Sequence, residues 1–310
     1  MPENIDLGSD KVAPGLEDIQ NIQINDLKTA AEFISQLQGA TLDASGLSPS
    51  MIQRLRNCPP QSPSGLDQST QFSIKLFIST LNSSQQTYES VRAAVLERYP
   101  EDNILSYHEV KKVLEELTGV TSIAHDMCYD TCVAFTGPFS ALDHCPSCRK
   151  PRYKEQRGGS SARCSKVPNR VFHTIPLGPQ IQSLWSSPDG AGDMLYSLYQ
   201  TERVKDRLSK NGGTTPFYDD FYSGTDYLTA VSEENIKNGD TILLFSLDGA
   251  QLYEHKQSDC WIYIWVILTL SPDKRYKKKH VLPGAFIPGP NKPKNIDSFL
   301  FPGLYLICSI

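Results

Sequence analysis

Residues 127–148 read MCYDTCVAFTGPFSALDHCPSC, and the four cysteines of this stretch decide what kind of module it forms. Cys128 and Cys132 make one close pair, and Cys145 and Cys148 make a second pair after a spacer of 12 residues. Two short pairs at this separation are typical of four thiolates that bind one tetrahedral zinc ion. The dipeptide at 137–138 is Gly-Pro, which favours a turn in the middle of the spacer. The stretch therefore predicts a small zinc-binding module.

Four unrelated cysteines, either buried or joined in disulfides, are the alternative interpretation. The remaining cysteines of the chain are scattered and form no close pair: Cys58, Cys164, Cys260 and Cys308. His125 precedes the pattern and His144 lies at the end of its spacer, and each could replace one cysteine or lie beside the site. Four thiolate ligands leave the ion no open coordination position, so the pattern predicts a structural zinc site and not a catalytic one.

The sequence carries no signal for export or for a membrane. A chain of 310 residues has room for two or three domains. Its start, MPENIDLGSDK, is acidic and lacks the apolar core of a signal peptide. The longest apolar run, CWIYIWVILTL at 260–270, has 11 residues, which fits a buried strand and is too short to span a bilayer. These features predict no membrane partner and a reducing compartment, which favours metal binding over disulfides.

Positive charge is concentrated in two runs, although the whole chain has a net charge of −5. Residues 145–170 carry eight Lys or Arg and one acid, and residues 273–280 carry five Lys or Arg and one acid. Basic residues beside a zinc module suit a phosphate backbone. Solvated loops and hairpin turns explain either run equally well when it is taken alone. The candidate nucleic-acid contacts are Arg149, Lys150, Arg152, Lys154, Lys277, Lys278 and Lys279.

The pattern of the sequence divides the chain into five regions. The first is polar and rich in Pro, Ser and Gln, which predicts disorder apart from a short helix over residues 27–37. Helical periodicity predominates in the second and fourth regions, and the last changes to runs typical of strands. The regions are 1–70 (disordered), 71–120 (helical), 121–155 (zinc module), 156–240 (linker and helices) and 241–310 (strand-forming core).

Two helices of the second region have clear terminal signals. Ser83 with Gln86 and Ser106 with Glu109 are candidate capping boxes, and Gly119 is a natural C-terminal cap. The connection between the helices is longer than the turn of a DNA-reading helix-turn-helix. We therefore expect a packed helical hairpin and no recognition helix.

Three strand-like runs follow one another in the last region: TILLFSLD (241–248), CWIYIWVIL (260–268) and HVLPGAFIPG (280–289). Runs of this length and spacing predict an antiparallel meander. Asp248 ends the first run, where a carboxylate is poised at a sheet edge. An aspartate at this position is also a common turn residue, and the pattern alone does not choose between the two roles.

Several long strings resemble transposases of fungal cut-and-paste DNA transposons, closest to the Plavaka family, which is related to the CACTA superfamily. The resemblance covers about residues 72–304 and rests on strings that occur in the family's order. The strings are HDMCYDTCVAFTGPFSALDHCPSC, TIPLGPQIQSLW, YDDFYSGTDYL and LLFSLDGAQLYEHKQSDCWIYIWVILTLSPDKRYKKKHVLPGAFIPGPNKPKNIDSFLFPGL.

This resemblance implies an α+β chain that ends in part of an RNase H-like catalytic core. In the family, three carboxylates bind two Mg²⁺ or Mn²⁺ ions that drive cleavage and strand transfer of DNA. Asp248 would be the first of the three, with Asp259 or Asp240 as the alternative ligand. The resemblance also implies transposon ends as the DNA partner, an intact transposase or a second copy as a protein partner, and a nuclear location.

The chain departs from the family after SFLFPGL, where YLICSI looks unrelated and the later catalytic acids do not follow. The sequence thus predicts a truncated transposase, catalytically incomplete as written, with the first three strands of the core only. We expect those strands to lack covering helices and so to expose an apolar face and an open edge. A zinc-dependent module that binds DNA or protein without catalysis is the alternative function, and an inert product is the third.

Overall fold

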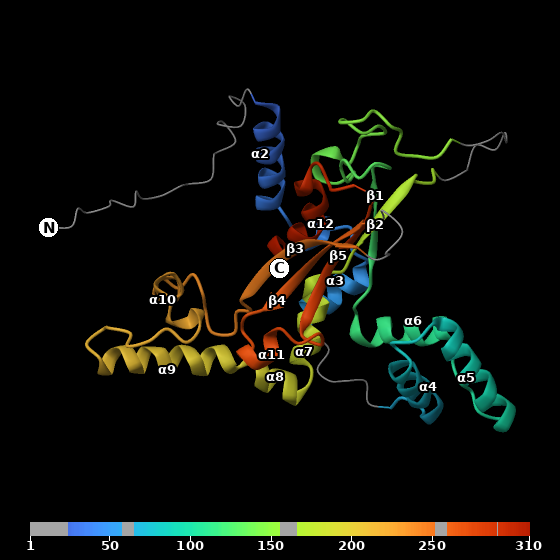
Figure 1. The fold of residues 1–310 in the computed structure, drawn as a ribbon, viewed down its shortest axis with the longest axis horizontal. Coiled ribbons are helices and arrows are strands. Elements are labelled where there is room, and N and C mark those ends of the chain that lie inside the picture. The colour runs from blue at the N-terminus through green and yellow to red at the C-terminus, as the bar shows by residue number, and fades with distance from the viewer. Residues whose placement is uncertain (1–23, 58–64, 156–165, 252–258, 290) are drawn as a thin grey trace.

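The computed structural model describes residues 24–57, 65–155, 166–251, 259–289 and 291–310, which form a mixed α+β fold around one five-stranded sheet (Figure 1). The strands lie in the order β1-β2-β5-β4-β3, and all neighbours are antiparallel. Their bounds are β1 Ile123–Met127, β2 Arg170–Thr174, β3 Leu243–Gln251, β4 Asp259–Ile267 and β5 Val281–Pro288. The expected α+β class is confirmed at this level.

The predicted meander of the last three strands is confirmed, and it is extended by two strands that the sequence did not reveal. β3 pairs with β4 along its whole length, and β4 pairs with β5 with a register shift between Tyr263 and Ile264. β2 then pairs with the other side of β5, so that His173 lies opposite Phe286. The expected zinc module and linker therefore each contribute one strand, β1 and β2, to the same sheet as the C-terminal region.

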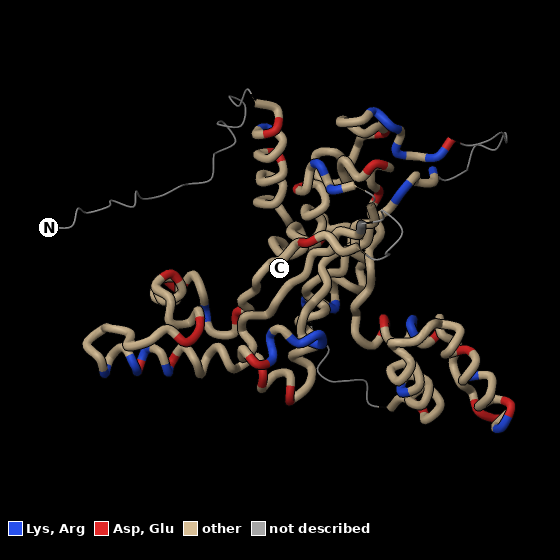
Figure 2. The backbone as a smooth tube through the Cα atoms, viewed as in Figure 1, with Lys and Arg blue, Asp and Glu red and all other residues tan. Residues whose placement is uncertain are grey.

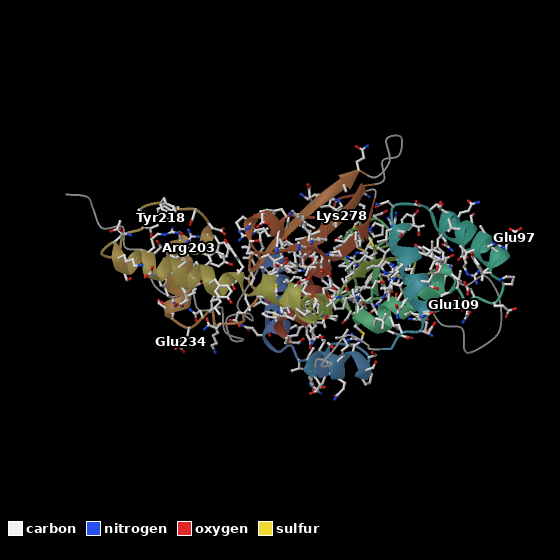
Figure 3. The ribbon with its side chains drawn as sticks, turned by 90° about the horizontal axis from the view of Figure 1, so that it is seen from below. Glu97, Glu109, Arg203, Tyr218, Glu234 and Lys278 are labelled. Atoms are coloured by element: carbon white, nitrogen blue, oxygen red, sulfur yellow. The ribbon has the colours of Figure 1, made fainter. Side chains whose placement is uncertain are left out.

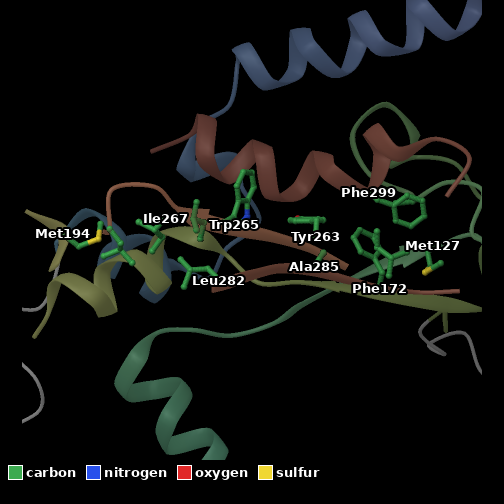
Figure 4. Packing of buried hydrophobic residues seen from close by; sticks show 13 residues of the cluster. Met127, Phe172, Met194, Tyr263, Trp265, Ile267, Leu282, Ala285 and Phe299 are labelled. Carbon is green, nitrogen blue, oxygen red and sulfur yellow. The ribbon is translucent and has the colours of Figure 1, made fainter. Parts of the chain in front are cut away.

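Helix α12, Ile296–Cys308, lies across one face of the sheet and corrects the expectation of an uncovered core (Figure 4). Tyr263 and Trp265 of β4, Phe172 of β2 and Phe299 of α12 are all buried in one cluster. The first four residues of the final hexapeptide, YLICSI, form the last turn of this helix, and Leu306 among them is buried. The opposite face is more open, since Leu244 and Phe286 are each 39% exposed there.

The N-terminal region is more ordered than its polar composition predicts. It forms α2 Asn25–Gln38, the short 3₁₀ helix η1 Leu42–Ala44 and α3 Pro49–Arg56. The ring of Phe33 packs between Phe139 and Phe301, with centroid distances of 5.6 and 5.5 Å. The helix predicted over residues 27–37 is therefore confirmed as part of α2. Disorder was the wrong expectation for the other residues of 24–57, because the partners of their few apolar side chains lie far away in the chain. The rest of the predicted disordered stretch falls largely outside the described residues.

Helices α4 Gln68–Ser79, α5 Gln85–Arg98 and α6 Tyr107–Thr118 form a unit to one side of the sheet (Figure 1). The predicted capping box of Ser106 and the left-handed cap at Gly119 are both present. The cap of α5 is Ser84, one residue later than predicted. Tyr88 donates a hydrogen bond of 2.8 Å to the carbonyl of Leu105, which ties the interhelical connection to α5. α4 completes the packing of this unit, so the predicted hairpin has a third member.

A second helical unit lies at the opposite end of the molecule, as the labels Glu97 and Arg203 in Figure 3 indicate. Its central link is the ion pair of Arg275 with Asp220, two hydrogen bonds of 2.9 and 2.8 Å between side chains that are 4% and 10% exposed. This pair holds the turn after β4 against the loop before η3. The elements are α8 Pro188–Met194, α9 Tyr196–Lys210, η3 Phe221–Ser223, α10 Thr225–Ser232 and α11 Pro272–Arg275. α7 Leu177–Trp185 precedes this unit and packs against the core of the sheet.

Candidate metal centre

The fold brings the four predicted cysteines together at one point beside the N-terminus of α12. The Sγ atoms of Cys128, Cys132, Cys145 and Cys148 all lie within 4.8 Å of one another. The closest printed pair, Cys128 and Cys148, is separated by 3.4 Å. A tetrahedral zinc ion with Zn–S bonds near 2.3 Å separates its ligands by about 3.8 Å. The four thiols are therefore close to the geometry of such a site and could hold a metal ion such as zinc.

Each cysteine pair sits on a tight turn closed by backbone hydrogen bonds. In the first turn the amide of Thr131 donates to the carbonyl of Cys128 at 3.0 Å. In the second the amide of Arg149 donates to the carbonyl of Cys145 at 2.9 Å. Thr131 and Arg149 have φ values of 60° and 63°, a left-handed conformation that few residues other than glycine adopt. Both turns thus accept local strain, and both point their thiols at the same centre.

Burial of the thiols shifts their pKa values and so determines how metal binding would depend on pH. Burial raises the pKa of Cys132 to about 11 and also raises the pKa of Cys128. Without a metal, both groups would therefore carry protons at neutral pH. A dication would replace those protons and neutralise the thiolates, so its binding would release protons and weaken in acid. The donor set is four sulfur atoms, which suits a structural zinc ion.

Neither candidate histidine belongs to the ligand group. The Nε2 atom of His125 lies 2.8 Å from the hydroxyl of Thr174, within hydrogen-bond distance, and burial lowers the pKa of this histidine to about 4. His144 is exposed, and its backbone pairs with Pro151. His125 therefore lies beside the site, one of the two outcomes left open by the sequence, and acts as a strand contact.

The predicted basic contacts of the zinc module differ in their freedom to bind a partner. Arg149 and Lys154 are exposed. Lys150 forms an ion pair of 2.7 Å with Asp130 but keeps 48% of its side chain exposed. Arg152 is directed inward: its Nε donates to Asp126 at 2.6 Å, and its Nη1 donates to backbone carbonyls. The structure therefore corrects the assignment of Arg152, which acts as an internal brace.

The second predicted basic run lies far from the zinc module. Lys277, Lys278 and Lys279 are exposed on the turn between α11 and β5. Figure 2 shows this turn and the basic residues of the zinc module at opposite ends of the sheet, with Lys278 also labelled in Figure 3. The two runs therefore do not form one continuous surface.

Sequence reasoning missed two lysines that the fold delivers to the zinc module. The amides of Lys294 and Asn295 donate to the carbonyl of Cys132, the second at 2.9 Å. The side chain of Asn291 donates to the carbonyl of Asp130 in the same turn. Lys292 and Lys294 are both exposed. No local signal identifies them, because their position depends on how the segment before α12 docks on a turn 160 residues earlier.

Asp248 lies within β3 and not at the end of a strand, where the sequence predicted it. Its side chain is exposed, and it accepts a hydrogen bond of 2.7 Å from the amide of Gly249. Of the two alternatives, Asp240 precedes β3 and accepts a hydrogen bond from the amide of Lys237, and the backbone of Asp259 opens β4 opposite Gln251. Among the described residues, the four cysteines are the only group of three or more potential ligands within metal-binding distance. The acidic side chains that the structure describes near Asp248 therefore form no group of three that could hold Mg²⁺ or Mn²⁺.

Comparison of the chain with models of known protein families, with curated protein sequences and with solved structures gives no match. A search of the described residues for membrane-spanning helices finds none of sufficient length and apolar character.

Proposed function

We propose that this chain is the N-terminal part of a DNA transposase and that its zinc module binds the phosphate backbone of DNA. The observation that carries the proposal is a four-cysteine site whose surface collects exposed basic residues from two separate segments. Arg149 and Lys154 follow the second cysteine pair, and Lys292 and Lys294 come from the segment docked on the first pair. Exposed cations held on a rigid frame suit contacts to phosphate groups.

The strand meander supports the proposed relation to a nuclease core. β3 occupies an edge of the sheet and carries an exposed carboxylate, Asp248. An edge strand of this length presents unpaired backbone groups that another strand can pair with. In our proposal, further strands and the remaining catalytic acids would be added beside β3, and this chain alone would not cleave DNA. The nuclear location belongs to the same proposal.

Salt-dependent binding to DNA tests the main proposal. Fluorescence anisotropy with a labelled duplex should show binding that weakens steeply as salt rises. Neutralising Arg149, Lys154, Lys292 and Lys294 to glutamine should lower the affinity and reduce the slope of log K against log salt by about three to four units, at roughly 0.9 per phosphate contact. Neutralising Lys205 and Lys210 instead is the matched control, because these exposed lysines on α9 form local ion pairs with acids of the same helix. An equal loss of slope in both variants would contradict the proposed interface.

A cleavage assay tests the catalytic part of the proposal. The protein is incubated with labelled terminal-repeat DNA and Mg²⁺ or Mn²⁺, beside an Asp248→Asn variant. We expect no cleavage by either protein. Cleavage that disappears in the variant would overturn the proposed inactivity and would establish Asp248 as a metal ligand.

The alternative is a zinc-dependent module that binds an intact transposase or a second copy of this chain. The solvent-exposed edge of β3 and the apolar side chains around it favour this candidate. Binding to a protein partner that is indifferent to salt, with no affinity for DNA, would select it over the main proposal.

A further inference from the structure

A pocket of about 370 Å³ lies between β1, the end of η1 and the second half of α12. Three aromatic side chains contribute to its walls: Phe135 from the segment after Cys132, and Phe301 and Tyr305 from α12. The volume falls in the range of small-molecule pockets, which combine apolar walls with a few polar groups. The proposed DNA interface uses none of these side chains.

One polar residue of the pocket wall is His125 of β1, whose side chain lies on the face of the sheet that α12 covers. The imidazole packs on the ring of Phe172 at a centroid distance of 5.2 Å, and Phe172 in turn packs on Phe299 of α12 (Figure 4). Ile123, two residues earlier and therefore on the same face of β1, also lines the pocket. The imidazole thus points to the side of the strand on which the pocket lies.

A hydrogen bond to Thr174 fixes which ring nitrogen of His125 carries the proton. Burial lowers the pKa of His125 to about 4, so the imidazole is neutral at pH 7 and has one N–H. Thr174 is buried, and Nε2 of His125, at 2.8 Å, is the only hydrogen-bond partner of its hydroxyl among the described residues. A buried hydroxyl without an acceptor costs about 1–3 kcal/mol, which donation to Nε2 avoids. Nε2 is then an acceptor, and the proton lies on Nδ1.

The Nδ1–H group of His125 remains available to a ligand. Nδ1 makes no hydrogen bond with the described residues, and it is not sealed away from solvent. The hydroxyls of Ser45 and Thr136, which also line the pocket, already donate to the carbonyls of Leu42 and Ser298. A ligand acceptor would replace water at Nδ1, and contact with the aromatic walls would supply most of the net affinity.

We propose that this pocket binds a planar, uncharged aromatic molecule with a hydrogen-bond acceptor that meets Nδ1–H of His125. The aromatic walls favour stacked or edge-to-face contacts with such a ring, and the neutral imidazole offers no charge to an anion. A ring nitrogen or an aryl carbonyl would supply the acceptor. Because Phe135 belongs to the zinc module and Phe301 to α12, the bound molecule would connect these two parts and stabilise their packing. The inference does not depend on the proposed DNA binding.

Quinoline is a suitable probe, because it is planar and its ring nitrogen accepts a hydrogen bond. Titration of the full chain at pH 8, followed by ¹⁵N NMR of the histidine side chains, should show a saturable shift of the His125 Nδ1 signal. The same spectra of the free protein should show the proton of His125 on Nδ1. A proton on Nε2, or a quinoline shift that does not saturate, would overturn the proposal.

Naphthalene and two variants isolate the hydrogen bond. Naphthalene has the shape of quinoline without the nitrogen, and the difference in hydrophobicity between the two ligands cancels when their affinity ratio is compared between proteins. In His125→Phe the ratio of quinoline to naphthalene affinity should fall about fivefold, because the ring remains and the donor is lost. His144→Phe, which replaces an exposed histidine outside the pocket, is the matched control and should keep the ratio.

An unchanged ratio in His125→Phe, or an equal fall in both variants, would refute donation from His125. If His125→Phe does not fold, the position of the proton and the saturable quinoline shift in the wild-type protein decide the question.

Discussion

Replacement of Ser298 by alanine tests how the zinc module holds α12 on the sheet. The Ser298 side chain is fully buried; its hydroxyl accepts a hydrogen bond of 2.9 Å from the amide of Ala134 and donates one of 2.8 Å to the carbonyl of Asn295. The hydroxyl of Thr136 in turn donates to the carbonyl of Ser298. These contacts join the segment after Cys132 to the first turn of α12. The Ser298→Ala variant breaks the two made by the hydroxyl and leaves the third in place.

The expected magnitude follows from the orphaned amide of Ala134. A buried donor without a partner costs about 1–3 kcal/mol. Alanine returns up to about 0.5 kcal/mol through its higher helix propensity. We therefore expect Ser298→Ala to lower the free energy of unfolding by about 1–2 kcal/mol. Urea denaturation followed by tryptophan fluorescence measures this change, since Trp265 lies in the cluster that α12 covers.

Metal removal adds a second arm to the same experiment. If the proposed zinc ion fixes the segment after Cys132, chelation should loosen that segment and reduce the cost of Ser298→Ala by at least about 0.5 kcal/mol. Ser309→Ala is the matched control, because its hydroxyl binds only the carbonyl of Leu306 at the end of α12. This control should change stability by less than about 0.5 kcal/mol. A Ser298→Ala cost that is the same with and without metal would refute the coupling.

Three further predictions concern side chains whose roles the structure defines. Arg152→Lys should lower the free energy of unfolding by about 1–3 kcal/mol, because it loses hydrogen bonds to backbone carbonyls. If the variant lost DNA affinity without any loss of stability in urea unfolding, Arg152 would instead be a phosphate contact. Asp220→Asn should cost about 3–5 kcal/mol in urea unfolding, because it leaves Arg275 buried without a counterion, and a cost below about 1 kcal/mol would contradict this role. His125 has its pKa lowered to about 4 from 6.5, so the unfolded state takes up its proton first as the pH falls. Stability from His125 should be complete above pH 6.5 and should fall between pH 6.5 and 4, by at most about 3 kcal/mol. His125→Phe should flatten this part of the stability curve, and an unchanged curve would exclude His125 as its source.

Local features were predictable where one short stretch contains all the interacting groups. The four cysteines lie within 21 residues, and their spacing alone predicted that their sulfur atoms would meet. Likewise, Ser106 and Glu109 satisfy each other's backbone amides one helical turn apart, so the start of α6 was visible in the sequence.

The predictions that failed concern residues whose partners are distant in sequence. Phe33 lies in a predicted short helix, but its burial was not predicted, because the rings that enclose it belong to residues 139 and 301. Arg152 looked like a surface cation, because Asp126, which pairs with it, lies on β1 and outside the basic run. Asp248 looked like the end of a strand, because only pairing with β4 extends β3 to Gln251.

The cysteine turns, the caps of α6 and the three-strand meander were predictable from the sequence alone, since each depends on the chemistry of neighbouring residues. Only the packed chain shows which basic side chains remain exposed, that the strand carrying Asp248 forms an edge of the sheet and which helix covers the sheet. It also brought Lys292 and Lys294 to the zinc module. The physical reason is that burial and charge pairing depend on contacts between distant segments, and the net free energy of those contacts exists only once the whole chain has packed.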